Sequence, residues 1–251
     1  MTANATDFAD FYRTALGIAT SRLVRRKLRE FWPALSTENI LGLGYPNPYL
    51  DLWRLQVTRT ISIIPSQLWH AHRPRYGATI TATADEDALP IADLSVDRVL
   101  VVHGLEHADS ARRMLREIWR ILAPAGRLVV IVPNRASIWA YLQRTPFGYG
   151  QPYTALQLED LLKAVMFQVE RRGSAVYVPP LRLRSLLRSA EVMERLGQRV
   201  LPGMSGVIMI EAAKDIAGLI PTIQTRRRVI VESYPHGLHR QTEGPNFSAR
   251  Q

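Results

Sequence analysis

Two apolar runs with a helix-length segment between them form the clearest pattern in the chain. The runs at 98–103 (RVLVVH) and 127–132 (RLVVIV) are short and rich in valine, isoleucine and leucine, as is typical of strands buried on both faces of a sheet. Asp109 is the expected N-cap of the intervening helix, and Pro124 and Gly126 mark its end. The apolar residues of this helix recur at helical spacing: Met114, Leu115, Ile118 and Leu122. Two buried strands joined by one helix predict a parallel crossover, and therefore an α/β fold.

Similar patterns predict further elements on both sides of this unit. Residues 7–32 form one long amphipathic helix in this interpretation, and Pro33 ends it. Further strands are expected at 39–44, 60–64, 78–84, 168–178 and 206–214. Further helices are expected at 50–57, 156–165 and 181–201.

The length of 251 residues suits one α/β domain with appendages. We expect an N-terminal amphipathic helix at 1–34 and an α/β domain at 35–218. Residues 219–251 are basic, contain Gly, Pro and Asn, and show no periodicity, so they are predicted to form a flexible tail.

The charge balance is strongly basic. The chain has 32 Lys and Arg against 22 Asp and Glu, which gives a formal net charge of +10. Such a charge favours anionic partners, namely nucleic acid, an acidic protein or a membrane surface. The basic residues are spread along the chain, with clusters only at 22–27, 182–188 and 226–228, and they do not interleave with aromatic residues as in RNA-binding segments. A generally basic proteome or solvated helix faces explain the charge more simply.

Other features limit the compartment and the chemistry. The chain has no cysteine, which excludes a disulfide framework and a thiolate nucleophile or ligand. No apolar run reaches the ~18 residues that a membrane-spanning helix needs. The first residues, MTANATDFADFYRTALG, carry acids and lack the apolar core of a signal peptide. We therefore expect a soluble, cytoplasmic protein.

Residues 85–134, which include LPIADLSVDRVLVVHGLEHADSARRMLREIWRILAPAGRLVVIVPN, resemble a known family. The pattern is similar to the second half of the class I S-adenosylmethionine (SAM) dependent methyltransferase domain, of the methyltransferase type 11-like kind. In that family an LPF-D-S-FD stretch precedes strand four, LEH follows it, and a helix ending in L-P-G-G leads to strand five. The resemblance implies a Rossmann-like fold with a mostly parallel seven-stranded sheet and helices on both faces. It also implies SAM as the cofactor and methyl transfer to an acceptor that the sequence does not identify.

The expected cofactor loop departs from the family pattern. Open parallel sheets bind ligands at the carboxyl ends of their strands, and the family has an acidic residue and then G-x-G-x-G after strand one. Here Gly42 replaces the acidic residue and Gly44 is retained, whereas Pro46 and Pro48 stand where the other glycines belong. Proline fixes φ and removes an N–H donor, so the loop loses flexibility and possible contacts with the ligand.

The remaining cofactor positions give a mixed picture. Ile64 aligns with the acid that usually holds the ribose hydroxyls, and an isoleucine side chain accepts no hydrogen bond. Asp85 stands after Ala84 at the position that commonly meets the adenine amine. The polar groups of Tyr45 and Asn47 could replace lost contacts. The cofactor-binding candidates are therefore Gly42, Gly44, Tyr45, Asn47, Ala84 and Asp85. Two hypotheses remain open, namely an active methyltransferase and a catalytically inactive fold that serves as a binding or regulatory subunit.

The sequence HGLEH supplies the catalytic candidates His103, Glu106 and His107. H-x-x-E-H also occurs in zinc proteases, but that site needs both histidines on one helix, and His103 ends a strand. By resemblance, the LEH turn lies at the lip of the active-site cleft, where these residues would act as a general base or bind substrate. Alternatively, they brace the turn. No metal is expected, although His70 and His72 could approach the same rim.

A polar and aromatic segment at 135–153 follows the fifth strand, where members of the resembled family shape the substrate pocket. Long loops often act as lids or binding segments. The substrate candidates are Asn134, Arg135, Arg144, Tyr149 and Tyr153. These side chains could equally fix the loop to the domain surface.

Overall fold

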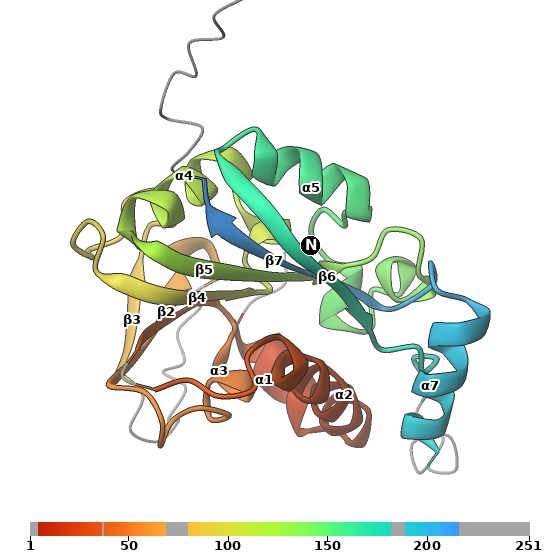
Figure 1. Cartoon of the computed structure of the whole chain (residues 1–251). Helices are drawn as coiled ribbons and strands as arrows, with labels where there is room; N and C mark the ends of the chain where they lie inside the picture. The colour runs from red at the N-terminus through yellow and green to blue at the C-terminus, as the bar shows by residue number, and fades with distance from the viewer. Residues whose placement is uncertain (1–4, 37, 69–79, 182–188, 216–251) are drawn as a thin grey trace, which may run out of the picture. The chain divides into compact units, whose positions relative to one another are not determined.

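A seven-stranded sheet forms the centre of the structure, which is a computed structural model and describes residues 5–36, 38–68, 80–181 and 189–215 (Figure 1). The strand order is β3-β2-β1-β4-β5-β7-β6. Neighbours from β3 to β5 pair in parallel, and β7 is antiparallel to both β5 and β6. The strands are β1 Asn39–Gly44, β2 Arg59–Pro65, β3 Ile80–Ala84, β4 Val96–Val102, β5 Leu122–Pro133, β6 Phe167–Ala175 and β7 Val207–Lys214. The sheet is thus the mostly parallel, Rossmann-like one that the sequence predicts.

Helices cover both faces of this sheet (Figure 1). The α-helices are α1 Ala5–Arg13, α2 Ala15–Phe31, α3 Asn47–Leu50, α4 Ala111–Ile121, α5 Ala155–Lys163 and α7 Ala190–Val200. Short 3₁₀ turns are η1 Ser66–Leu68, η2 Leu105–His107, η3 Ile138–Tyr141 and η4 Pro146–Gly148. In Figure 1, α4 and α5 lie on one side of the sheet, and α1, α2 and α3 lie on the other.

Alternation along the buried strands builds one hydrophobic core on each face. Leu41 and Val101 belong to the core that includes α4 and α5. Ile40, Leu100 and Val102 belong to the core that includes α2 and α3. Because β1 lies between β2 and β4, the strand order reverses at the carboxyl end of β1, where open α/β sheets bind ligands.

The N-terminal segment differs from its prediction. The expected helix at 7–32 is two helices, because Thr14 adopts an extended backbone (φ −71°, ψ 158°) and its side chain accepts a hydrogen bond from the N–H of Gly17 at 3.0 Å. Thr14 is therefore the N-cap of α2, and α1 is free to take another direction. The amphipathic pattern continues across the break and conceals it.

Three further boundaries also differ. The helix predicted to end at Pro124 and Gly126 ends at Ile121, because Leu122 adopts an extended backbone, and Leu122, Pro124 and Gly126 all belong to β5.

The helix expected at 50–57 is the single turn α3, which begins earlier because proline at the start of a helix favours its first turn. The N-cap of α4 is Ser110 and not Asp109, because the Ser110 side chain accepts from the N–H of Arg113 while the N–H of Asp109 donates to Glu86.

All the strands described fall within the predicted domain at 35–218. The predicted tail at 219–251 lies outside the described residues, as does part of the basic helix predicted at 181–201. No helix among the described residues is long and apolar enough to span a bilayer.

Candidate functional site

The carboxyl ends of β1 and β4 meet at the point where the strand order reverses. Gly44 ends β1 with φ +93°, and a Cβ atom at this position would overlap with the carbonyl oxygen of Val102. The N–H of Tyr45 donates to the same oxygen at 2.6 Å. A glycine is therefore required at position 44, and the loop that follows β1 is held against the end of β4.

His103 follows β4 directly and lies at the centre of a buried polar chain. Its φ of +50° is in the left-handed region, which residues other than glycine seldom adopt, and its side chain is 2% exposed. The Nδ1 atom lies 3.1 Å from Oε1 of Glu106, and the Nε2 atom lies 2.9 Å from the hydroxyl oxygen of Tyr12. Because the Glu106 carboxylate only accepts, Nδ1 carries the proton and Nε2 accepts from Tyr12.

The tyrosine hydroxyls extend this chain away from His103. The hydroxyl oxygens of Tyr12 and Tyr49 lie 2.9 Å apart. Burial raises the pKa of both hydroxyls well above the ordinary tyrosine value, so both remain protonated. Since Tyr12 donates to His103, Tyr49 donates to Tyr12. The chain of hydrogen bonds therefore runs from Tyr49 through Tyr12 and His103 to Glu106.

Several buried polar atoms beside this chain have no hydrogen-bond partner within the described residues. They are Oε2 of Glu106, Nε2 of His107 and both side-chain amide atoms of Asn47. Leaving a buried donor or acceptor unpaired costs about 1–3 kcal/mol. Burial also lowers the pKa of the His107 imidazole, which favours its neutral form. These atoms are suited to receive a polar ligand at this edge of the sheet.

Apolar side chains occupy the neighbouring space at the ends of β1 and β2. Phe8 of α1, Tyr45, Ile64 and Leu68 form one buried cluster, in which Phe8 is 0% exposed. The Phe8 ring stacks on the His103 ring with centroids 4.7 Å apart and lies 5.4 Å from the Tyr45 ring. The side chains of α1 therefore fill the region that Ile64 faces.

Ser66 and Asp85 form a more exposed polar pair at the carboxyl ends of β2 and β3. The hydroxyl of Ser66, just after β2, donates to Oδ1 of Asp85, just after β3, at 2.5 Å. Both residues are exposed, and Ala84 is half-buried at the end of β3. The following residue, Glu86, is buried and accepts from the backbone of Asp109, and burial raises its pKa. Asp85 thus remains accessible at the rim.

The predicted cofactor residues form two groups in space, one at the end of β3 (Ala84 and Asp85) and one at the end of β1. A Cβ atom on Gly42 would overlap with the ring of Pro46, so the absence of a side chain at this position makes room for that proline. Gly44, Tyr45 and Asn47 lie in the turn between β1 and α3, with the orphaned amide of Asn47 buried. The geometry therefore gives Gly42 a packing role, whereas Asn47, in the turn after β1, has a side-chain amide that is unpaired among the described residues.

The predicted substrate residues are not brought together. Tyr149 packs against the cluster of Phe8, Tyr45, Ile64 and Leu68. Tyr153 packs against the core on the opposite face, and Asn134 uses its amide to hold the carbonyl of Gly203 and the N–H of Ala136. The side chains of Arg135 and Arg144 are exposed.

Four aromatic residues at the site were not predicted from the sequence. Phe8 and Tyr12 lie one turn apart on α1, Tyr49 lies on α3, and the ring of Phe147 meets His103 edge-on at 4.9 Å. The signal available in the sequence was the pair of aromatic residues four positions apart in an amphipathic helix, which also fits ordinary core packing.

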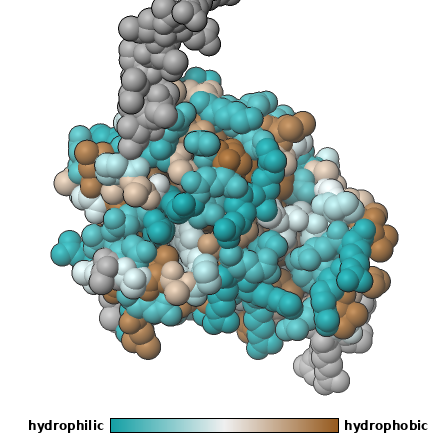
Figure 2. All heavy atoms as spheres, viewed as in Figure 1, coloured by the Kyte–Doolittle hydropathy of each residue, from teal (hydrophilic) through white to brown (hydrophobic). Residues whose placement is uncertain are grey.

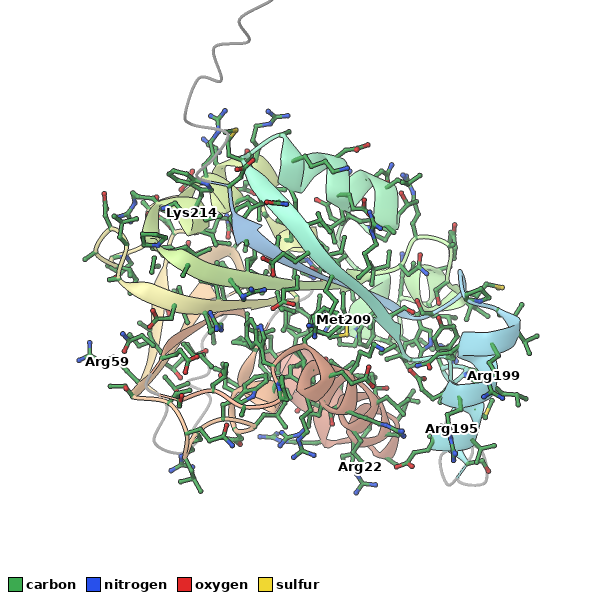
Figure 3. The ribbon with its side chains drawn as sticks, viewed as in Figure 1. Arg22, Arg59, Arg195, Arg199, Met209 and Lys214 are labelled. Carbon is green, nitrogen blue, oxygen red and sulfur yellow. The ribbon has the colours of Figure 1, made fainter. Side chains whose placement is uncertain are left out.

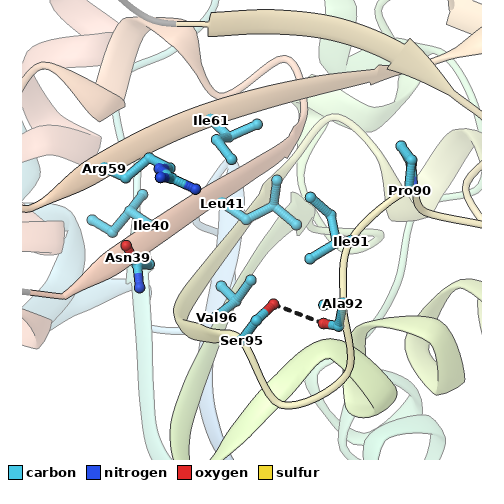
Figure 4. A pocket seen from close by; sticks show the side chains of 10 residues that line it. All are labelled: Asn39, Ile40, Leu41, Arg59, Ile61, Pro90, Ile91, Ala92, Ser95 and Val96. Atoms are coloured by element: carbon cyan, nitrogen blue, oxygen red, sulfur yellow. Dashed lines mark hydrogen bonds between the residues drawn. The ribbon is translucent and has the colours of Figure 1, made fainter.

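Two cavities lie away from this network. One of about 410 Å³ opens near the end of β5, between the start of α5 and the strands β6 and β7, with Asn134, Arg172 and Ser205 in its wall. The other, of about 360 Å³, lies at the amino ends of β1, β2 and β4, where Leu41, Ile61 and Val96 form an apolar wall (Figure 4). The second cavity is remote from the strand ends that carry the polar chain.

No cluster of three or more metal-binding side chains occurs within the described ranges. His70 and His72 lie outside these ranges, so a metal site that joins them to His103 and His107 stays a hypothesis.

Comparison with known proteins identifies the class of this fold. A family model described as a methyltransferase domain matches residues 41–130. The chain is 31% identical over 113 residues to an uncharacterized protein of Mycobacterium tuberculosis, covering 42% of this chain and 40% of that protein. It is 30% identical over 132 residues to a probable S-adenosylmethionine-dependent methyltransferase of Mycolicibacterium smegmatis, covering 51% of this chain and 50% of that protein. The chain thus spans about half or less of the length of these relatives.

Solved structures agree at the level of the fold. A SAM-dependent methyltransferase from Archaeoglobus fulgidus superimposes with a TM-score of 0.53 at 18% identity, covering 77% of this chain and 94% of that one. The strand order and this likeness show that the chain has the fold of class I SAM-dependent methyltransferases, as the resemblance in its sequence implied. Residues 41–130 are the part that matches the methyltransferase-domain model.

Proposed function

We propose that this protein transfers a methyl group from SAM to an oxygen or nitrogen atom of an acceptor, with His103 as the general base. The observation that carries the proposal is the buried chain from Tyr12 through His103 to Glu106, at the carboxyl end of β4. A histidine whose Nδ1–H is held by a carboxylate presents Nε2 as a proton acceptor.

The residues at the strand ends fit SAM when α1 is displaced. The glycine turn at Gly44 allows a ligand to approach the backbone, and Asn47 offers an unpaired buried amide. Asp85 and Ser66 offer exposed polar groups at the ends of β3 and β2. When bound, SAM would supply an electrophilic methyl group. With α1 seated, Phe8 fills the space between these groups, so the protein binds the cofactor in a state with α1 moved aside.

The protein's own groups then have defined tasks. Once Tyr12 moves away with α1, Nε2 of His103 is free to accept the proton that the acceptor loses. Glu106 holds Nδ1–H and stabilises the resulting imidazolium, while the left-handed backbone at His103 fixes the direction of the ring. A positioned base of this kind contributes about 10²–10⁴-fold to a rate.

Calorimetric titration with SAM and with S-adenosylhomocysteine tests the cofactor step. We expect saturable heat for both ligands, and we expect the Asp85→Ala variant to bind more weakly. His103→Ala should retain binding but lose transfer of label from methyl-tritiated SAM to small molecules of a cell extract. An absence of heat with either ligand, both in the full chain and in a chain that lacks residues 1–14, would refute the proposal.

A second candidate is a catalytically inactive methyltransferase fold that acts as a binding or regulatory subunit. The buried cluster of Phe8, Tyr45, Ile64 and Leu68 favours it, because these side chains close the region at the ends of β1 and β2. This candidate predicts that neither the full chain nor the chain without residues 1–14 binds SAM, although both remain folded by circular dichroism.

A further inference from the structure

Apolar side chains lie exposed along one face of α7. Val192, Leu196 and Val200 are 55%, 62% and 68% exposed, and their spacing of four residues places them in one stripe. Leu201 and Met204 continue the exposed apolar surface just beyond the helix. Figure 2 shows hydrophobic residues at the right-hand edge, over the place of α7 in Figure 1. Monomeric proteins seldom expose such a cluster without a partner.

The orientation of α7 is fixed by its other face. The Glu194 carboxylate accepts from the backbone N–H groups of Val176 and Tyr177 at 2.9 and 2.7 Å. Ala190 packs with Leu23 of α2 in a small buried cluster. The outward direction of the apolar stripe is therefore set by the fold.

Arginines flank this stripe. Arg195 and Arg199 are exposed on α7 at the right of Figure 3, and the exposed Arg22 of α2 is at the bottom of the same view. Glu191, the acidic residue of the first turn of α7, lies 3.8 Å from Arg26 of α2, which offsets its charge. The surface thus combines apolar side chains with a net positive charge.

We propose that the α7 face, defined as Val192, Leu196, Val200, Leu201 and Met204 with Arg195 and Arg199, binds the surface of a lipid bilayer that contains anionic lipids. A helix lies in the interface of such a bilayer when apolar side chains enter the acyl boundary and arginines meet the headgroups.

The charge and the apolar stripe of the α7 face argue against two other partners, namely a second copy of this chain and a nucleic acid. In a symmetric dimer through this face, Arg195 and Arg199 of both copies would meet near the axis and repel each other. A nucleic acid would leave the apolar stripe without a partner, because its backbone offers phosphates and sugars. An anionic bilayer satisfies both parts of the α7 face, and this inference does not depend on the proposed methyltransferase activity.

Vesicle co-sedimentation of the full chain tests the inference. Vesicles of phosphatidylcholine alone are compared with vesicles of phosphatidylcholine mixed with phosphatidylglycerol, at low and high salt. We expect binding to the mixed vesicles that is at least about tenfold stronger and that weakens with salt. A basic residue near such a surface contributes about fivefold to partitioning. The double variant Arg195→Glu/Arg199→Glu and the single variant Leu196→Glu should each bind at least about tenfold more weakly.

Matched variants separate this site from the general charge of the protein. Arg112 and Arg116 are exposed on α4 with the same spacing as the α7 arginines, and Leu156 is an exposed leucine on α5. Arg112→Glu/Arg116→Glu and Leu156→Glu should bind as the unmodified protein does. Equal loss in the α4 and α7 double variants would overturn the proposal, as would an absence of vesicle binding. A dimer in light scattering that Leu196→Glu dissociates without vesicles would also overturn it, in favour of a second copy.

Discussion

Replacing Phe8 by alanine should strengthen SAM binding while it weakens the fold. Phe8 is fully buried, and its ring contacts the rings of His103, Tyr45 and His107 at centroid distances of 4.7, 5.4 and 5.7 Å. Truncation of a buried phenylalanine costs about 3–5 kcal/mol when the whole protein unfolds. Here the lost contacts hold α1 against the strand ends. Most of the lost free energy therefore destabilises the closed state, in which α1 covers His103, relative to the open state, in which α1 is displaced.

The expected gain in affinity follows from the population of the open state. If SAM binds only when α1 is displaced, its apparent dissociation constant is the intrinsic constant divided by the open fraction. Each 1.4 kcal/mol removed from the closed state then raises the affinity about tenfold, until the open state dominates. A loss of about 3 kcal/mol therefore predicts a gain of up to about a hundredfold.

Calorimetry with SAM measures this gain, and urea unfolding measures the loss of stability. Leu28→Ala is the matched control, because Leu28 is also fully buried but lies in the core beneath α2. Leu28→Ala should lower the free energy of unfolding by about 2–5 kcal/mol without strengthening SAM binding. Equal affinities in the unmodified protein, Phe8→Ala and Leu28→Ala would show that Phe8 does not compete with the cofactor.

Three further variants test other parts of the site. Tyr12→Phe should lower the free energy of unfolding by about 1–3 kcal/mol in urea titration, because it leaves buried polar partners unpaired, whereas the exposed Tyr141→Phe should change it by less than about 0.5 kcal/mol. Burial lowers the pKa of His107, so the folded state favours the neutral imidazole. The neutral imidazole therefore stabilises the fold above the unfolded-state pKa of about 6.5, and this stabilisation is lost as the pH falls below that value. Thermal unfolding from pH 8 to pH 5 should therefore show a smaller decline for His107→Gln, and parallel curves would contradict this. Gly44→Ala should cost at least about 2 kcal/mol through its positive φ and backbone overlap, whereas Gly203→Ala, with open space around it, should cost less than about 1 kcal/mol.

The sheet was predictable because its signal is local. The strand predicted at 39–44 has the observed bounds. The apolar run at 98–103 falls on β4 except for His103, and the run at 127–132 falls on β5. A buried parallel strand needs little more than a short run of branched apolar residues, which a sequence displays directly. The break at Thr14 was not predictable in this way, since both helices continue one amphipathic pattern.

The candidate site was predictable only where chain order and strand ends define it. The resemblance named His103 and Glu106, and both belong to the buried polar chain. It did not name Phe8 or Tyr12, because their contacts with His103 join residues far apart in the sequence. Tyr12 and His103, for example, are 91 positions apart. Such contacts depend on the direction of α1, which tertiary packing decides.

The departures from the family pattern and the seating of α1 have a common physical basis. Ile64 stands where the family carries an acid, and it is fully buried against Phe8. A carboxylate at this position would lose its hydration against an aromatic ring with no charged partner in the cluster, a cost of several kcal/mol. The isoleucine that stands in place of the expected ribose-binding acid therefore also allows Phe8 to cover His103. An apolar surface on which α1 rests thus occupies the position where the resembled family has a polar contact with its ligand.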